Sequence, residues 1–448
     1  MKVFHGVRPV FDEPNLVSGA GLVPVLELAE SVGLTDLLDR SVTVSVPNVA
    51  VKARTVIAGM LAGADNIDDV GVLRSGGMSR VMGGVRAPST VGTFLRAHSH
   101  GHVLQLGRVN RRILTGLADR VSGLVGLDGV VFLDLDDTVR EVHGHQKEGA
   151  GYGYTGVRGL NALFATISTA DTAPVIAEFS LRRGNTRSGT SADWFTARAL
   201  STIREISPER QVLVRGDSAF CTNKHVHTVL RGGAWFSFTI QQWPTVTAAI
   251  GQITEDAWTP IVYPRAVRDE ETGELISEAE VAEIRYTAFT SKPKAAQVEC
   301  RLVVRRVKRL NQATAESGTW RYHAFITNST LSTVDADVQH RQHAIIEQTI
   351  AELKGGPLAH LPSGRFHANA AWVGYACITF NIARAAAVAA GTVTARMATV
   401  QRTLINVPAR IASTARQLVL HLPERWPWQG AWTRLWNTAI SPPTPGTA

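Results

Sequence analysis

The chain has 448 residues, of which 44% are hydrophobic and 19% are charged, so a packed core is feasible and a wholly disordered chain is excluded. Its formal net charge is +8, and 38 of its 46 basic residues are Arg, a side chain suited to planar anions such as phosphates. This excess is compatible with a nucleic-acid partner and also with an Arg-rich codon usage. Three widely spaced Cys exclude a disulfide framework and a Cys-x-x-Cys zinc site, and the lack of a long apolar run predicts no membrane span.

Residues 1–125 are predicted to form a helical N-terminal domain. Apolar residues recur at helical spacing in Gly21–Arg40 and Val51–Arg74, and Ala87–Leu114 opens with a Pro-Ser-Thr sequence typical of a helix start. The last of these helices carries four Arg, namely Arg96, Arg108, Arg111 and Arg112. These Arg could grip a DNA backbone or form a solvated helix face, so we expect a DNA-binding or oligomerisation domain.

Residues 126–240 are predicted to form an α/β core. Short apolar runs indicate strands, and three of them come before the first helix. The predicted order is strand Gly129–Asp137, strand Leu160–Ser168, strand Ala173–Gly184, helix Ala192–Ile206, strand Gln211–Asp217, helix Asn223–Arg231 and strand Ala234–Ile240. This mixture of strands and helices is typical of an α/β fold.

Residues 241–328 are β-like and polar, with Pro and Gly punctuation, and we interpret them as a β-rich insertion subdomain. The run Arg301–Arg309, taken as a strand, places Arg301, Arg305 and Arg309 on one face. That face is a candidate DNA-binding surface.

Two segments complete the chain. Residues 329–392 are predicted to return to helices that finish the core. Residues 393–448 form a basic tail that we predict to be helical, because three Trp recur every four residues, at Trp428, Trp432 and Trp436. Packing of a terminal helix explains this stripe, and contact with DNA or a partner is the alternative.

Carboxylates end two of the predicted strands. Asp134 and Asp136 share one face of a strand end, and Asp217 closes another strand. Gathered carboxylates repel one another unless a cation such as Mg²⁺ binds between them. On the helix that follows the insertion, His340, His343, Glu347 and Lys354 share one stripe, whereas Glu352 lies about 140° from Glu347 around the helix axis.

Two families share parts of this pattern. Phe132–Val139 resembles the Asp-x-Asp-x-Thr motif of haloacid-dehalogenase-type phosphatases, which implies Asp134 as the nucleophile and Asp136 as the acid/base. That family also needs a later acidic pair, and Cys221 stands where its second Asp should be. Three strands before the first helix also depart from that family's alternation of strands and helices.

The chain also resembles bacterial insertion-sequence transposases of the DDE type, over about residues 20–390. Their third motif, Tyr-x-x-Arg-x-x-x-Glu-x-x-x-x-x-x-Lys, falls on His340, His343, Glu347 and Lys354, with His at the Tyr and Arg positions. The first motif, an Asp two residues before a Thr, falls on Asp136, and the second falls on Asp217. Leu181–Gly189, which contains Arg183, and Arg365–Trp372 also look like family sequence.

This resemblance implies an RNase H-like core with a mixed five-stranded sheet, and Asp136, Asp217 and Glu347 as the catalytic, metal-binding acids. Asp134 is a further candidate ligand. It implies two Mg²⁺ ions, with Mn²⁺ as a substitute, and DNA contacts from Lys354, His340, His343 and Arg183. The expected protein binds terminal inverted repeats and target DNA as a homodimer or larger assembly in the cytoplasm, associated with the nucleoid. An inactive or domesticated DNA-binding protein is the alternative.

Overall fold

The computed structural model of the chain describes residues 7–144, 146–262, 277–309, 320–414 and 417–442. The chain divides into two compact units. Unit 1 comprises Met1–Leu124, Gly144–Glu148 and Glu352–Ala448, and unit 2 comprises Val125–His143 and Gly149–Ala351. The segments predicted as an N-terminal domain and a C-terminal tail therefore belong to the same unit, because the chain returns to it after residue 351.

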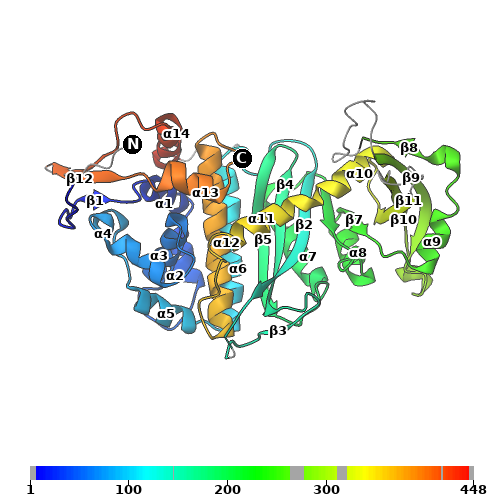
Figure 1. Ribbon diagram of the computed structural model, residues 1–448, viewed down its shortest axis with the longest axis horizontal. Coiled ribbons are helices and arrows are strands. Elements are labelled where there is room, and N and C mark those ends of the chain that lie inside the picture. The colour runs from blue at the N-terminus through cyan, green and yellow to red at the C-terminus, as the bar shows by residue number, and fades with distance from the viewer. Residues whose placement is uncertain (1–6, 145, 263–276, 310–319, 415–416, 443–448) are drawn as a thin grey trace. The chain divides into compact units, whose positions relative to one another are not determined.

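Unit 2 is built on a mixed sheet, and β2 is the middle one of the five strands that surround the candidate acids (Figure 1). The strand order on this part of the sheet is β5-β4-β2-β6-β7, in which β4 is antiparallel to both β5 and β2, and β6 and β7 run parallel to β2. The bounds are β2 Val131–Glu141, β4 Arg158–Thr169, β5 Thr172–Arg183, β6 Val212–Gly216 and β7 Trp235–Thr239. The helices α7 (Ala192–Ile206) and α8 (Asn223–Arg231) join the later strands, with the bounds predicted from the sequence.

The strands of the insertion extend this same sheet. β11 (Trp320–Thr327) pairs antiparallel with β7, and β10 (Val298–Arg309), β9 (Ser277–Ala288) and β8 (Thr259–Pro260) follow in order. With β3 (Gly151–Tyr152) beside β4, the described residues form a ten-stranded sheet. The insertion strands thus continue the sheet beyond the five strands β5-β4-β2-β6-β7, and their description as a subdomain stays a prediction. β7 would otherwise present an unpaired edge, and β11 satisfies its backbone groups.

Helices follow the insertion strands. α10 (Thr333–Arg341), a 3₁₀ turn (Gln342–Ala344) and α11 (Ile345–Lys354) follow one another along a line that crosses the strands of the sheet (Figure 1). α9 (Pro244–Ile250) and two 3₁₀ turns, Glu255–Ala257 and Lys294–Ala296, lie within the insertion. The stripe of residues that begins at His340 therefore spans two helical segments with a change of geometry between them.

Unit 1 is mainly helical. Its helices are α1 Leu22–Glu30, α2 Leu34–Ser41, α3 Val49–Ala62, α4 Met78–Met82, α5 Pro88–Arg96, α6 His100–Arg120, α12 Phe366–Ala389, α13 Met397–Val400 and α14 Gln429–Ile440, with a 3₁₀ helix at Asp68–Arg74 and a π-helix at Gln401–Ile405. The tail is not wholly helical as predicted, because β12 (Ala409–Thr414) and β13 (Gln417–His421) form a small sheet with β1 (Leu16–Val17). In β12, Ala409 and Ile411 are buried and Arg410 between them is exposed, as in a strand with one buried face.

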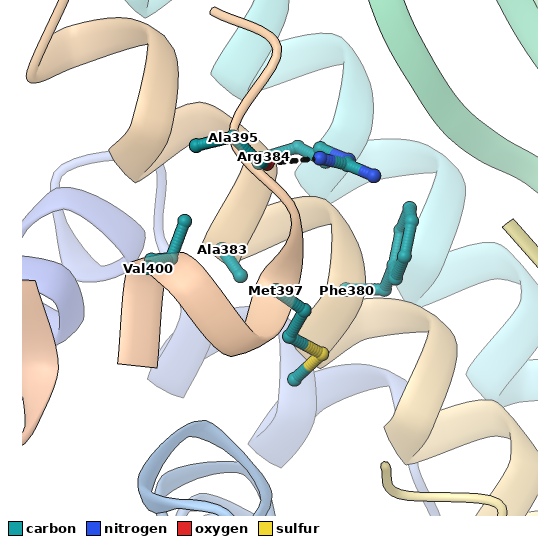
Figure 2. A pocket seen from close by; sticks show the side chains of 6 residues that line it. All are labelled: Phe380, Ala383, Arg384, Ala395, Met397 and Val400. Carbon is teal, nitrogen blue, oxygen red and sulfur yellow. Dashed lines mark hydrogen bonds between the residues drawn. The ribbon is translucent and has the colours of Figure 1, made fainter. Parts of the chain in front are cut away.

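α12 is the central helix of unit 1. Among the described residues it is the one helix long and apolar enough to cross a membrane, and 94% of its apolar window is buried. The burial indicates a core helix. Near its end, Arg384 lies over the ring of Phe380 and donates a hydrogen bond to the Ala395 carbonyl (Figure 2). Arg384 also donates to Glu352 at 2.7 Å. Glu352 is thus occupied in an ion pair of unit 1, as its separation from Glu347 around α11 suggested.

Candidate active site

Asp136 and Asp217 occupy equivalent places on neighbouring parallel strands. The register pairs Asp134 with Arg215 and Leu135 with Gly216; Asp136 is the next residue on β2, and Asp217 directly follows the end of β6. The strands form because their residues are apolar and buried: Val131, Leu133 and Leu135 on β2, and Val212 to Val214 on β6, are at most 2% exposed. Two buried apolar strands therefore place two carboxylates side by side where β6 ends; β2 itself continues to Glu141, so Asp136 lies within its strand and not at the strand end that the sequence predicted.

The environment of Asp136 disfavours its charged form. Burial raises the pKa of Asp136 to about 6, and the charges of Asp137 and Asp217 add to the rise. The backbone N–H of Asp137, which donates to Asp136 Oδ1 at 2.7 Å, and the charge of His343 oppose it. Asp217 is exposed, and its Oδ1 accepts a hydrogen bond from the backbone N–H of Ala219 at 2.8 Å. A bound cation would relieve the repulsion that raises the pKa of Asp136.

Asp134 is fully buried, and the positive charge of Arg215 balances the negative charge of its carboxylate. Arg215 donates from Nε to Asp134 Oδ1 and from Nη2 to Oδ2, both at 2.7 Å, and His343 Nδ1 lies 2.9 Å from Oδ1. Burial alone would raise the pKa of Asp134, but the charge of Arg215 and the hydrogen bonds from His343 and Arg215 hold it below the usual value. The Arg215 guanidinium also lies 4.2 Å from the centre of the Phe132 ring.

Asp137 points to the opposite face of β2 and has partners of its own. Arg182 Nη2 donates to its Oδ2 at 2.6 Å, Asn161 Nδ2 donates to the same oxygen, and Ser188 Oγ donates to Oδ1 at 2.9 Å. Arg182 also donates to the carbonyls of Ser188 and Thr190. Asp137 therefore ties β2 to the loop after β5.

The third-motif residues occupy three different environments. His340 is bonded through Nδ1 to Ser237 Oγ at 2.9 Å and through Nε2 to Thr239 Oγ1 at 3.1 Å, and burial holds its pKa well below the usual value. His343 contacts Asp134 as described above, whereas Glu347, on the first turn of α11, is exposed. Among the described residues, no group of three or more His, Cys, Asp or Glu side chains is arranged to hold a metal ion. The structure thus brings Asp136 and Asp217 together, but it does not gather them with Glu347 into a metal cluster.

The donor chemistry at the strand ends still fits a divalent cation. Carboxylate oxygens are the ligands that Mg²⁺ prefers, and the pKa of Asp136 is raised by burial and by the charges of Asp137 and Asp217, which the charge of His343 offsets only in part. The two acids and Glu347 on the neighbouring helix supply oxygen donors. Asp134 differs from them, because both its oxygens already accept from Arg215.

The basic residues proposed for DNA lie in several places. Arg301 is paired with Glu283 and Arg305 with Asp337, the latter at 3.1 Å, while the side chain of Arg309 lies outside the described residues. Arg183 is exposed at the end of β5, and Lys354 is the last residue of α11. Internal pairing of Arg301 and Arg305 leaves less of their charge for a polyanion.

Sequence reasoning missed three residues around the acids, Arg215, Arg182 and Tyr154. The only available signal for Arg215 was a charged residue within an otherwise apolar strand. Tyr154, which is 70% exposed, follows β3, and burial together with the charges of Asp137, Asp136 and Asp217 raises the pKa of its phenol. An exposed aromatic ring therefore lies within electrostatic range of the candidate acids.

Comparison with known proteins identifies the class. The sequence profile of the transposase DDE domain group 1 family matches residues 5–440, and the chain belongs to this family. It is therefore a transposase of the DDE type, as its motifs predicted. No curated protein matches the chain significantly. The family match leaves no support for the phosphatase alternative, whose nucleophile, Asp134, is also held by Arg215.

Proposed function

We propose that the protein is the transposase of an insertion sequence, which binds the terminal inverted repeats, cuts the DNA at the element ends and joins the 3′-OH to target DNA. The observation that carries the proposal is the placement of Asp136 and Asp217 directly after the paired stretch of β2 and β6, in a chain of the DDE family. The strand order β5-β4-β2-β6-β7, with its first three strands antiparallel and its last two parallel to β2, supports an RNase H-like core.

Asp136, Asp217 and Glu347 would hold two Mg²⁺ ions, for which Mn²⁺ can substitute. When bound, such ions stabilise charge on the attacking and leaving oxygens of the phosphodiester bond. Asp136 presents its carboxylate from β2, Asp217 from the residue after β6, and Glu347 from α11. The Asp134–Arg215 pair keeps the ends of β2 and β6 in register, and we assign it this structural role in place of metal binding.

DNA would be held by basic residues of both units. On the N-terminal helices, Arg96, Arg108 and Arg112 are exposed, as is Arg183 on β5, and Lys354 would contact a phosphate close to the cut. Because such contacts are to the backbone, DNA affinity should fall steeply with salt concentration. Pairing two element ends requires a homodimer or a larger assembly.

The test is metal-dependent nicking of a duplex that carries the element's own ends. We expect wild-type protein to nick this duplex in Mg²⁺, and Asp136→Ala and Glu347→Ala to bind it without nicking. A catalytically inactive or domesticated DNA-binding protein would bind the ends and leave them intact in Mg²⁺ and in Mn²⁺. Nicking by Asp136→Ala at the wild-type rate would overturn the assignment of the site.

A further inference from the structure

The segment before Glu347 contacts four strands of the sheet, β10, β7, β6 and β2, through polar side chains. Arg305 on β10 pairs with Asp337 at 3.1 Å, and His340 bonds to Ser237 and Thr239 on β7. On β6, Arg215 Nη1 donates to the Gln339 carbonyl at 2.7 Å. On β2, Asp134 accepts from His343 at 2.9 Å. His343 is therefore the last of these attachments before Glu347.

His343 lies where the direction of the helix is set. α10 ends at Arg341, the 3₁₀ turn Gln342–Ala344 contains His343, and α11 begins at Ile345. Glu347 follows His343 by four residues, about one turn further along the chain of helices, and its side chain is exposed. Asp134 and Asp136, two residues apart on β2, share a face.

The anchor that His343 uses cannot easily shift. The Asp134 side chain is 0% exposed and that of Arg215 is 1% exposed, and their two parallel hydrogen bonds fix the orientation of the carboxylate. Asp134 Oδ1 accepts from both Arg215 Nε and His343 Nδ1. The buried carboxylate thus joins β2, β6 and the turn before α11.

We propose that His343 is a positioning residue that acts through Asp134 to fix the start of α11, and with it the position of Glu347 relative to Asp136 and Asp217. This inference rests on the proposed function, because it assigns Glu347 a metal. It differs from the role in phosphate binding that the sequence suggested for His343, since Nδ1 is committed to Asp134 and only 19% of the side chain is exposed.

Substitutions of His343 can distinguish the positioning role from phosphate binding, because they keep or remove a donor at the place of Nδ1. Asn at position 343 can place an amide N–H close to where Nδ1 stands, whereas the amide of Gln corresponds to Nε2. In full-length protein, we expect His343→Gln and His343→Ala to weaken Mn²⁺ binding, measured by electron paramagnetic resonance without DNA, about 10–100-fold. His343→Asn should retain Mn²⁺ affinity within about threefold of wild type. Affinity for the duplex should stay unchanged in all three variants.

A double-mutant cycle tests whether the effect passes through Glu347. If it does, His343→Gln should weaken Mn²⁺ binding in the wild-type background and change it little in Glu347→Gln. The proposal would be overturned if the effects of His343→Gln and Glu347→Gln on Mn²⁺ binding were fully additive, or if His343→Gln left Mn²⁺ binding unchanged. It would also be overturned if His343→Gln lost affinity for the duplex and kept its Mn²⁺ binding. Equal losses of Mn²⁺ affinity in His343→Asn, His343→Gln and His343→Ala, in proportion to their fall in melting temperature, would also overturn it. Coupling of His343 to Glu347 without any nicking of DNA would instead refute the proposed function alone.

Discussion

Asp134 and Asp136 lie two residues apart on β2, yet their carboxylates have opposite electrostatic environments. The guanidinium of Arg215 holds the pKa of Asp134 below its usual value, whereas burial and the neighbouring acids raise the pKa of Asp136 to about 6. One carboxylate is satisfied within the protein, and the other is left with repulsion that a cation can remove. This contrast separates a structural acid from a candidate metal ligand on the same strand face.

Neutralising Asp136 should stabilise the metal-free protein. Because its pKa is raised in the folded state, the folded state binds more protons, and unfolding free energy rises as pH falls from about 6 toward the unfolded value near 4. At pH 8 in EDTA, we expect Asp136→Asn to raise the unfolding free energy by about 1–3 kcal/mol. Calorimetric melting at pH 8 and pH 5 measures this, and the gain should shrink at pH 5. A lower melting temperature at pH 8 would contradict it.

Divalent cations should stabilise wild-type protein but not this variant. A ligand that binds only the folded state adds about 2.7 kcal/mol at a concentration 100 times its dissociation constant. We therefore expect Mg²⁺ or Mn²⁺ to raise the melting temperature of the wild type in a concentration-dependent manner, with little effect on Asp136→Asn. Equal shifts in both proteins would show that the metal binds elsewhere.

Removing Asp134 should have the opposite effect on stability. Asp134→Ala leaves the Arg215 guanidinium, 1% exposed, without its carboxylate, and breaking a buried pair in this way costs about 3–5 kcal/mol. Urea unfolding measures the loss. The matched control is Asp134→Leu combined with Arg215→Met, which removes both charges and should recover much of the lost stability. A mild effect of Asp134→Ala would mean that the ion pair contributes little.

The sequence predicted the strands and helices around the acids well, because each is a short apolar run or an amphipathic segment. α7 and α8 have the predicted bounds, and β2 extends the predicted strand. The pairing of β11 with β7 was missed, because strand neighbours distant in sequence leave no local pattern. The Arg215–Asp134 pair was missed for the same reason, since it depends on the register of two strands 81 residues apart.

Motif spacing predicted which acids form the candidate site, but it could not predict the environment of each side chain. Spacing placed His343 and Glu347 on one stripe, and it could not show that His343 bonds to a buried Asp134. Spacing also could not show that both ring nitrogens of His340 form hydrogen bonds with Ser237 and Thr239 on β7. These contacts depend on how α10 lies across the sheet, which is decided by tertiary packing.

Acid should destabilise the protein through its buried His. His225 is 1% exposed, its Nδ1 donates to the Phe220 carbonyl at 2.8 Å, and its Nε2 lies 2.7 Å from Thr196 Oγ1. Burial lowers the pKa of His225 to about 4, against hydrogen bonding to Phe220 and the charge of Asp193. The unfolded state therefore takes up the proton first, and unfolding free energy falls as pH drops from about 6.5 to about 4.

Between pH 7.5 and pH 5, the preferential protonation of His225 in the unfolded state should lower the unfolding free energy by about 2 kcal/mol. His225→Asn keeps a donor for the Phe220 carbonyl and should lose stability at pH 7.5, but it should lose less than the wild type on going to pH 5. The matched control is His143→Asn, whose side chain is 88% exposed in the wild type and whose pH dependence should follow the wild type. Urea midpoints at the two pH values measure the difference. Parallel pH profiles for His225→Asn and the wild type would show that His225 is not the group that acid protonates on unfolding.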